Sequence, residues 1–388
     1  KQQLDNGHFD AIQTRVELEK ELTRRLRDLS GDNHIGVVYD PDNVKRYLAR
    51  EQARASNAKM KENEAHKAQR LLEAQTDNFG IDGIRRLHGN LGYLEMSYFD
   101  GHAEESRDAF AAAMNMLQNS EAFILDLRRN GGGNSKILPL FLSYFIGPEA
   151  THFATRSERW RNSESKLLTD NSSEGAKFYD TPLYILTSGT TFSLAEHVSY
   201  HLRAFRNATL VGERTYGGGR AFDPVVVDEH FYLRIPRIEM RNALTKAMYR
   251  EGEGITPDVP VSADQALVTA QWLAQQHLLS QESGNRDYYQ WAQRLVQPGY
   301  APESLTFSLP DFVGEKQFDE FRFEVRQESL WLAFRGLPWV KLKNLGNGYF
   351  FDDRSIQRQF QFINKDESWQ LRVERVFREA YVLDETGP

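Results

Sequence analysis

Two segments of this chain combine residue types that are suited to acyl-transfer chemistry. The first, Ala122–Gly133, is a hydrophobic run that ends in three consecutive glycines, and the second, Tyr184–Glu196, is a similar run that leads to Ser193. Each pattern predicts a buried strand that ends in a turn and then enters a helix. Because the strands of a layered α/β fold present ligands at their C-terminal ends, we expect both turns to contribute to one site.

Ser193 and the glycines predict a nucleophile beside an oxyanion hole. A helix that starts at Ser193 places unpaired N–H groups and the positive end of its dipole near the hydroxyl, which favours an alkoxide or its adduct. Glycines let main-chain N–H groups approach a developing negative charge closely. The expected donors are the N–H of Leu194 and that of either Gly131 or Gly132.

Both features also have simpler explanations. Ser193 could be an ordinary helix N-cap, since Thr190 and Thr191 crowd the same turn. The glycine triplet could be only a tight turn, although its position after a hydrophobic strand favours the functional interpretation.

Four segments then carry a resemblance to a known family. Asp126–Gly133, Thr191–Glu196, Val211–Gly219 and Glu251–Val259 occur in the order seen in the tail-specific protease superfamily. That superfamily includes the C-terminal processing proteases, the tricorn core protease and a group resembling interphotoreceptor retinoid-binding protein, to which this chain is most similar. The resemblance runs from about Leu18 to Leu267. It implies an α/β fold with a crotonase-like (ClpP-like) core and a serine peptidase activity.

The resemblance also implies which base activates Ser193. The processing proteases use a lysine, but alignment with their motif places Gly218 at that position, so a Ser–Lys dyad is not expected. The tricorn-like branch takes a histidine from an N-terminal segment, which His34 matches. A serine hydroxyl needs such an imidazole, held in one tautomer by a carboxylate.

The same branch supplies that carboxylate just before a turn that matches Gly254–Asp258 here, which points to Glu251. Glu253, two residues later, is the competing candidate, and either could be a solvated loop residue. The implied catalytic residues are therefore Ser193, His34 and Glu251.

The sequence predicts three regions. Residues 1–80 are expected to form an N-terminal helical cap and a linker helix, with helices within Asp10–Leu29 and Val44–Ala74. Residues 81–282 are expected to form the peptidase core. Residues 283–388 should contain a helix and a small antiparallel β-sandwich or barrel, because short alternating runs rich in Phe and Trp follow one another there.

Within the predicted core, two βαβ units are expected around residues 92–125 and 184–212. Segment 151–180 is polar and is expected to be irregular, with Trp160 lining a substrate cleft. His197 and His201 have the spacing of a metal pair on a helix, but a solvent-facing helix surface is favoured because no third ligand is near. No cofactor and no metal are expected.

Composition limits the classes of partner. The net charge of −7 and the absence of a clustered basic stripe argue against nucleic acid. No apolar run is long enough for a membrane span. The absence of cysteine suits a periplasmic or extracellular protein, and the resemblance also favours export, with a signal peptide removed before Lys1. Homo-oligomerisation stays open.

The expected substrate is a short or unfolded peptide. The alternative is a non-catalytic protein that binds hydrophobic ligands in the same cleft, as the retinoid-binding relative does. A third hypothesis makes the C-terminal β region part of a surface assembly. The presence of all three implied catalytic residues favours the peptidase.

Overall fold

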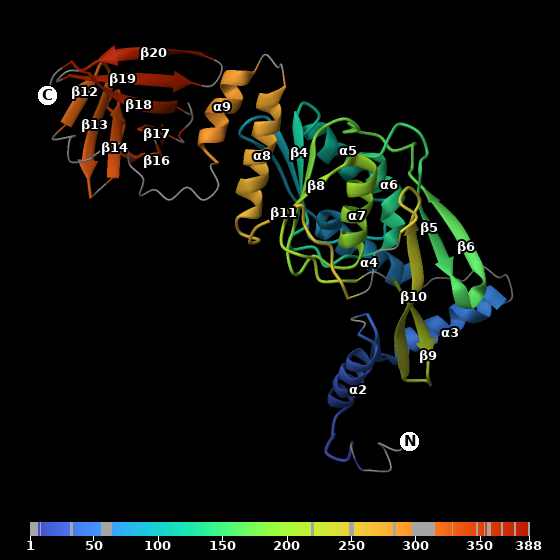
Figure 1. Cartoon of the computed structure of the whole chain (residues 1–388). Coiled ribbons are helices and arrows are strands. Elements are labelled where there is room, and N and C mark those ends of the chain that lie inside the picture. The colour runs from blue at the N-terminus through green and yellow to red at the C-terminus, as the bar shows by residue number, and fades with distance from the viewer. Residues whose placement is uncertain are drawn as a thin grey trace. The chain divides into compact units, whose positions relative to one another are not determined.

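A computed structural model describes most of the chain as two compact units, residues 1–270 and 271–388 (Figure 1). The described residues are 7, 9–31, 34–55, 64–218, 221–247, 252–281, 285–296, 315–327, 329–346, 348–352, 354, 358–365, 368–375 and 378–386. No helix in these ranges is both long and apolar enough to cross a bilayer.

The centre of the first unit is a six-stranded sheet in the order β11-β8-β7-β4-β3-β2. Its strands are β2 (Ile81–Leu87), β3 (Leu91–Met96), β4 (Ala122–Asp126), β7 (Leu183–Thr187), β8 (Thr209–Gly212) and β11 (Val259–Pro260). β2 and β3 form an antiparallel hairpin, and β3, β4, β7, β8 and β11 run parallel. Helix α5 (Arg107–Met116) joins β3 to β4 and α7 (Leu194–Arg206) joins β7 to β8. Both predicted βαβ units are therefore confirmed.

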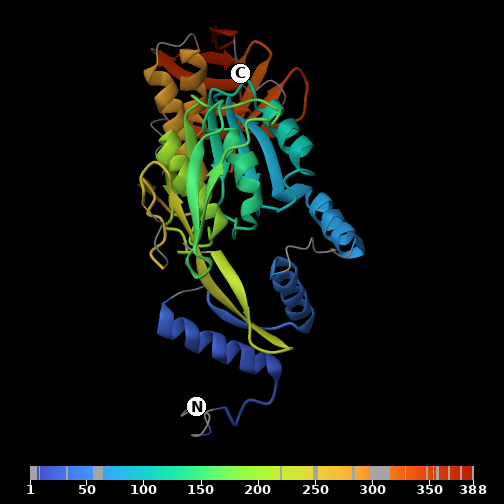
Figure 2. The ribbon, with the colours of Figure 1, turned by 90° about the vertical axis from the view of Figure 1, so that its right-hand side faces the viewer.

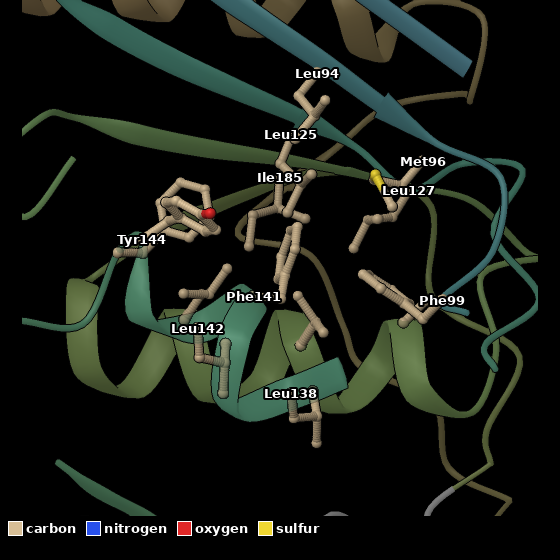
Figure 3. Close-up of a cluster of buried hydrophobic side chains, with 14 of the residues drawn as sticks. Leu94, Met96, Phe99, Leu125, Leu127, Leu138, Phe141, Leu142, Tyr144 and Ile185 are labelled. Atoms are coloured by element: carbon tan, nitrogen blue, oxygen red, sulfur yellow. The ribbon is translucent and has the colours of Figure 1, made fainter. Parts of the chain in front are cut away.

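Large apolar side chains hold this sheet against its helices. Figure 3 shows Leu125 and Ile185 from the strands facing Phe141 and Leu142 from α6 (Leu138–Ser143). These four side chains are fully buried. Burial of each such side chain contributes about 1.5–3 kcal/mol, so the ends of β4 and β7, where the predicted functional turns begin, are firmly fixed.

A second sheet contains β1 (Gly36–Tyr39), β5 (His152–Glu158), β6 (Ser163–Leu168), β9 (Ala221–Val226) and β10 (Phe231–Asn242), all antiparallel. The prediction of an irregular segment 151–180 is wrong here, because β5 and β6 form a hairpin on β10. The polar, exposed side chains of β6 lack the apolar alternation that identifies a half-buried strand. Figure 2 shows β9 and β10 extending from the core toward α2 and α3.

The N-terminal helices are α2 (Arg15–Ser30), α3 (Pro41–Ala55) and α4 (Glu64–Thr76). Thr14 and Glu17 form a reciprocal capping box at the start of α2, and Gly31 ends that helix in the left-handed region at φ 68°. The Thr23 hydroxyl accepts a hydrogen bond from Val37 N (3.0 Å) and donates one to Val37 O (3.3 Å). This side chain therefore attaches α2 to β1.

The second unit contains most of α8 (Ala266–Ser280), α9 (Arg286–Arg294) and two antiparallel sheets. One sheet holds β12 (Glu315–Phe318), β13 (Phe321–Arg326), β14 (Ser329–Phe334) and β15 (Val340–Lys341). The other holds β16 (Lys343–Gly346), β17 (Tyr349–Asp352), β18 (Arg358–Lys365), β19 (Ser368–Arg375) and β20 (Arg378–Asp384). Side chains from both sheets share one aromatic core. The antiparallel strands expected in this region are therefore present.

Candidate active site

Ser193 stands at the start of α7 in a strained backbone conformation. Its φ is 54° and its ψ is −115°, in a region of backbone conformation that residues other than glycine rarely adopt. Such strain costs on the order of 1–3 kcal/mol and persists only when the surroundings impose it. This backbone conformation places the Ser193 hydroxyl in front of the first turn of α7.

Hydrogen bonds join the turn before Ser193 to the glycine turn after β4. Thr191 donates its hydroxyl to Leu127 O at 2.8 Å, and Phe192 N donates to Asn130 O at 3.1 Å. Asn130 is fully buried and donates its amide to Met96 O at 3.0 Å. The two turns predicted to share a site are therefore held directly against each other.

The expected oxyanion donors differ in their availability. Gly132 is in contact with the nucleophile turn: a Cβ there would lie 2.8 Å from Ser193 Cβ and 2.9 Å from Leu194 N. However, its own N–H donates to Asn130 Oδ1 at 2.9 Å. Among the described residues, the Gly131 N–H has no acceptor. Leu194 is the first residue of α7, so its N–H precedes the first intrahelical bond.

His34 lies beside Ser193, although 159 positions separate them in the sequence. Its Nε2 is 3.4 Å from Ser193 Oγ, and its ring stacks on Phe192 with centroids 4.7 Å apart. The imidazole is 9% exposed. Strand β1, two residues later, pairs with β10 from Gly36 opposite Arg234, and this pairing carries the histidine to the site.

The imidazole stands in the space next to Gly218. A Cβ at Gly218 would lie 2.5 Å from His34 Cε1 and 2.4 Å from Phe192 Cε2. Such contacts are too short for real carbon atoms, so a side chain at this position and the imidazole of His34 exclude each other.

Glu251 lies outside the described residues, but the residue that follows it lies beside the site. Gly252 N donates to Gly217 O at 3.0 Å, and Ile255 N donates to the Thr215 hydroxyl at 2.7 Å. The loop that begins at Gly252 is therefore attached to the loop that ends at Gly218. The competing Glu253 is exposed, and its backbone carbonyl accepts from Arg214 Nη1 at 2.9 Å.

Glu196 organises the site, and no role was predicted for it. Its buried carboxylate accepts hydrogen bonds from the N–H groups of Ser193 (2.8 Å), Gly217 (2.9 Å) and Gly218 (2.6 Å) and from the Thr215 hydroxyl. One side chain thus fixes both the nucleophile and the loop against which His34 lies. The Ser-x-x-Glu spacing of a capping box was the only signal in the sequence.

A second buried carboxylate fixes the glycine turn from the other side. Asp126 accepts from Tyr93 OH at 2.7 Å and from Arg128 Nη2 at 2.6 Å. The hydrogen bond to Asp126 raises the pKa of Arg128 above its ordinary value, against the opposing effect of burial. The Arg128 carbonyl in turn accepts from Thr190 Oγ1 at 2.8 Å, so this pair supports the nucleophile turn as well.

The expectation that His197 and His201 face solvent is wrong. They are 3% and 0% exposed, and their rings stack with centroids 6.2 Å apart. Asn242 donates to His201 Nδ1 at 3.0 Å. Burial, and secondarily the neighbouring His197, lowers the pKa of His201 to about 3, so this ring is neutral. The described residues contain no cluster of three or more side chains suited to a metal ion.

Sequence comparison relates part of the chain to a known family. Residues 90–261 match the family model of peptidase family S41. The resemblance of this segment to the tail-specific proteases is therefore confirmed. A carboxyl-terminal-processing protease of Synechocystis sp. is 33% identical over 136 residues, covering 34% of this chain and 29% of that protein. A carboxy-terminal-processing protease of Bartonella bacilliformis is 25% identical over 189 residues, covering 45% of this chain and 40% of that protein. The chain thus matches less than half the length of these relatives.

Solved structures give weaker similarities. The photosystem II D1 C-terminal processing protease has a TM-score of 0.36 at 21% identity, covering 45% of this chain and 43% of that protein. A lipoprotein from Streptococcus agalactiae has a TM-score of 0.45 at 15% identity, covering 70% and 85%.

Proposed function

We propose that this chain is a serine peptidase in which Ser193 is the nucleophile and His34 is the base. The observation that best supports this proposal is the distance of 3.4 Å between His34 Nε2 and Ser193 Oγ, with the imidazole beside Gly218. The processing proteases have their lysine at that position, so here the histidine fills the role from a different part of the chain. Distances between catalytic groups without substrate are commonly longer than in the reacting complex.

The reaction follows from these positions. The Ser193 Oγ bonds to the carbonyl carbon of the peptide while its proton passes to His34 Nε2. The C–N bond then breaks, and the leaving amine takes that proton. Water hydrolyses the acyl-enzyme by the same route in reverse. Glu251 is proposed to orient the imidazole, which is supported by the contact of Gly252 with Gly217.

The oxyanion hole is proposed to consist of the N–H groups of Leu194 and Gly131. The Gly132 N–H is less suitable because Asn130 already accepts it. Removing one such donor typically costs about 2.7–4 kcal/mol of transition-state stabilisation.

The substrate class and the setting are part of the same proposal. Short or unfolded peptides are the proposed substrates, on a crotonase-like core within residues 81–282. Export to a periplasmic or extracellular location is proposed from the resemblance and the absence of cysteine.

Peptide cleavage by the whole chain and by three variants tests this function. Denatured casein and a mixed-peptide library are incubated with each protein, and fragments are identified by mass spectrometry. Ser193→Ala and His34→Ala are expected to lose at least about 10³-fold in kcat. Ser199→Ala is the matched control, because its hydroxyl lies on the same helix and, in the described part of the chain, donates to Ala195 O at 2.8 Å within that helix.

If the unsubstituted chain cleaves a substrate and Ser193→Ala cleaves it equally well, Ser193 is not the nucleophile. No cleavage by any of the four proteins, together with saturable binding of a hydrophobic ligand, would replace the peptidase by the non-catalytic binding protein.

A further inference from the structure

An exposed tyrosine stands on a fixed part of the candidate active site. Tyr216 is 51% exposed, although its neighbours Thr215 and Gly217 are buried. The hydroxyl of Thr215 and the N–H of Gly217 both donate to Glu196. Tyr216 N itself donates to Thr191 O at 2.9 Å, in the turn that precedes the nucleophile. The backbone on both sides of the exposed ring is therefore held in place.

A series of ring contacts leads from the proposed base to this tyrosine. The ring of Phe192 lies 4.7 Å from that of His34 and 5.1 Å from that of Tyr216, measured between centroids. Phe192 directly precedes the nucleophile and is itself partly exposed. The two residues after Tyr216 are glycines, which have no side chain to cover these rings. Phe192 and Tyr216 thus give the site an apolar wall.

The proposed reaction indicates which part of a peptide meets this wall. His34 Nε2 takes the proton of Ser193 Oγ and then gives it to the leaving amine. The nitrogen of the residue that follows the cleaved bond must therefore lie within hydrogen-bond reach of the imidazole. The side chain of that residue begins at the carbon next to this nitrogen. It is therefore expected beside the imidazole and the ring of Phe192 that stacks on it.

We propose that Phe192 and Tyr216 form the subsite for the residue that follows the cleaved bond, and that this subsite prefers an aromatic or a large aliphatic side chain. The inference rests on the proposed function, because it assigns a contact within the same active site. An apolar side chain on this wall removes apolar surface of both partners from water, and a pair of aromatic rings adds further attraction. A small polar side chain gains neither.

Cleavage of a peptide library reports this preference directly. The first residue of each new C-terminal fragment is the one that followed the cleaved bond, and mass spectrometry identifies it. Peptides that differ only at this position, with Phe, Leu, Ala or Ser, then give a kcat/KM value for each side chain. We expect Phe and Leu to exceed Ser by at least about fivefold, because the wall covers one side of the side chain rather than burying it fully.

Acyl transfer to added amines separates the leaving side from the rest of the peptide. An amino-acid amide can replace water at the acyl-enzyme. Its nitrogen bonds to the acyl carbon, the bond from that carbon to Ser193 Oγ breaks, and one amine proton passes through His34 to Ser193 Oγ. Phenylalaninamide and serinamide are the probes. At equal concentration, we expect at least about fivefold more transfer to phenylalaninamide.

Three variants locate the preference. Tyr216→Ala removes the exposed ring and should bring the ratio of Phe to Ser below about two in both assays. Tyr216→Phe keeps the ring and should keep the ratio. Met116→Ala is the control, because it removes a 72% exposed apolar side chain at the end of α5 and should leave the ratio unchanged. Each ratio compares two substrates in one preparation, so a smaller folded fraction does not alter it.

Every outcome decides the inference. It is overturned by a preference for apolar residues only before the cleaved bond, by equal transfer to the two amides, or by an unchanged ratio in Tyr216→Ala. Each of these results leaves Ser193 as the proposed nucleophile. No cleavage by the unsubstituted chain would instead remove the proposed function, and this inference with it.

Discussion

At the scale of single residues, one buried carboxylate joins the proposed nucleophile to a neighbouring loop. Glu196 accepts from the backbone of Ser193, Gly217 and Gly218 and from Thr215. Its carboxylate holds backbone groups of the nucleophile turn and of the neighbouring loop, so we interpret it as a positioning residue. Its effect on catalysis comes from holding two loops in one geometry.

Glu196→Gln should lower both activity and stability. The amide keeps the shape, but its NH₂ group faces donors instead of accepting from them. Leaving buried donors unpaired costs about 1–3 kcal/mol each, so we expect a drop of at least about tenfold in kcat and a lower melting temperature. Peptide kinetics and thermal unfolding measure these effects. Glu105→Gln, at an exposed position of the same unit, should change neither.

His201 should make stability dependent on pH. Its pKa is about 3 when folded and 6.5 ordinarily, so the unfolded chain takes up a proton below about pH 6.5 while the native ring stays neutral. Stability is therefore lost as the pH falls through this window, by about 2 kcal/mol between pH 7 and 5 from this group. His201→Phe should remove that part of the loss. Urea unfolding at both pH values measures it, and equal losses in the two proteins would contradict the assignment.

At the scale of elements, two loops and a strand from distant parts of the chain assemble the site. Strand β1 brings His34, the turn after β7 brings Ser193, and the loop after β8 leaves room for the imidazole at Gly218. Each element supplies one part of the arrangement, and the site exists only where the three meet. Their junction is where a small steric change should act strongly.

Gly218→Ala should displace His34. The added Cβ would approach the imidazole within 2.5 Å, so the ring must move away from Ser193. We expect kcat to fall by at least about tenfold, since a misplacement of about 1 Å can cost 10²-fold. Gly147→Ala, whose Cβ would lie 3.9 Å from the nearest atom, is the control. Unchanged kinetics in Gly218→Ala would mean that the imidazole is not fixed in this position.

The sequence predicted the elements better than their junctions. Strand β4 and helix α7 follow from apolar periodicity and from glycine and serine at their ends. The hairpin β5–β6 was missed because β6 is exposed on most of its residues, and the burial of His201 was missed because Phe153 and Asn242 cover it from distant elements. The role of Glu196 was missed because it depends on a loop about twenty positions away.

At the scale of the whole molecule, the two units have separate hydrophobic cores. The first is built from the parallel sheet and its helices. The second is built from two antiparallel sheets, with Phe323 packed against Phe318, Phe360 and Phe362. The family match lies wholly in the first unit. Damage to the second core should therefore affect stability without affecting the peptidase chemistry.

Phe323→Ala should separate these two properties. Deleting a buried phenylalanine costs about 3–5 kcal/mol, so calorimetry should show a lower unfolding temperature for the second unit. Peptidase kcat measured below that transition should stay unchanged. Phe141→Ala, in the core of the first unit, should lower both. Loss of kcat in Phe323→Ala while the second unit is still folded would show that the unit takes part in catalysis.

Covalent labelling with a fluorophosphonate tests the central claim that His34 activates Ser193. The rate is measured for the whole chain, for His34→Ala and for Ser193→Ala, and the labelled peptide is identified by mass spectrometry. We predict a single adduct on Ser193, a rate at least about 10³-fold lower in His34→Ala, and none in Ser193→Ala. Labelling of Ser193 at an undiminished rate in His34→Ala, or an adduct on another serine, would contradict it.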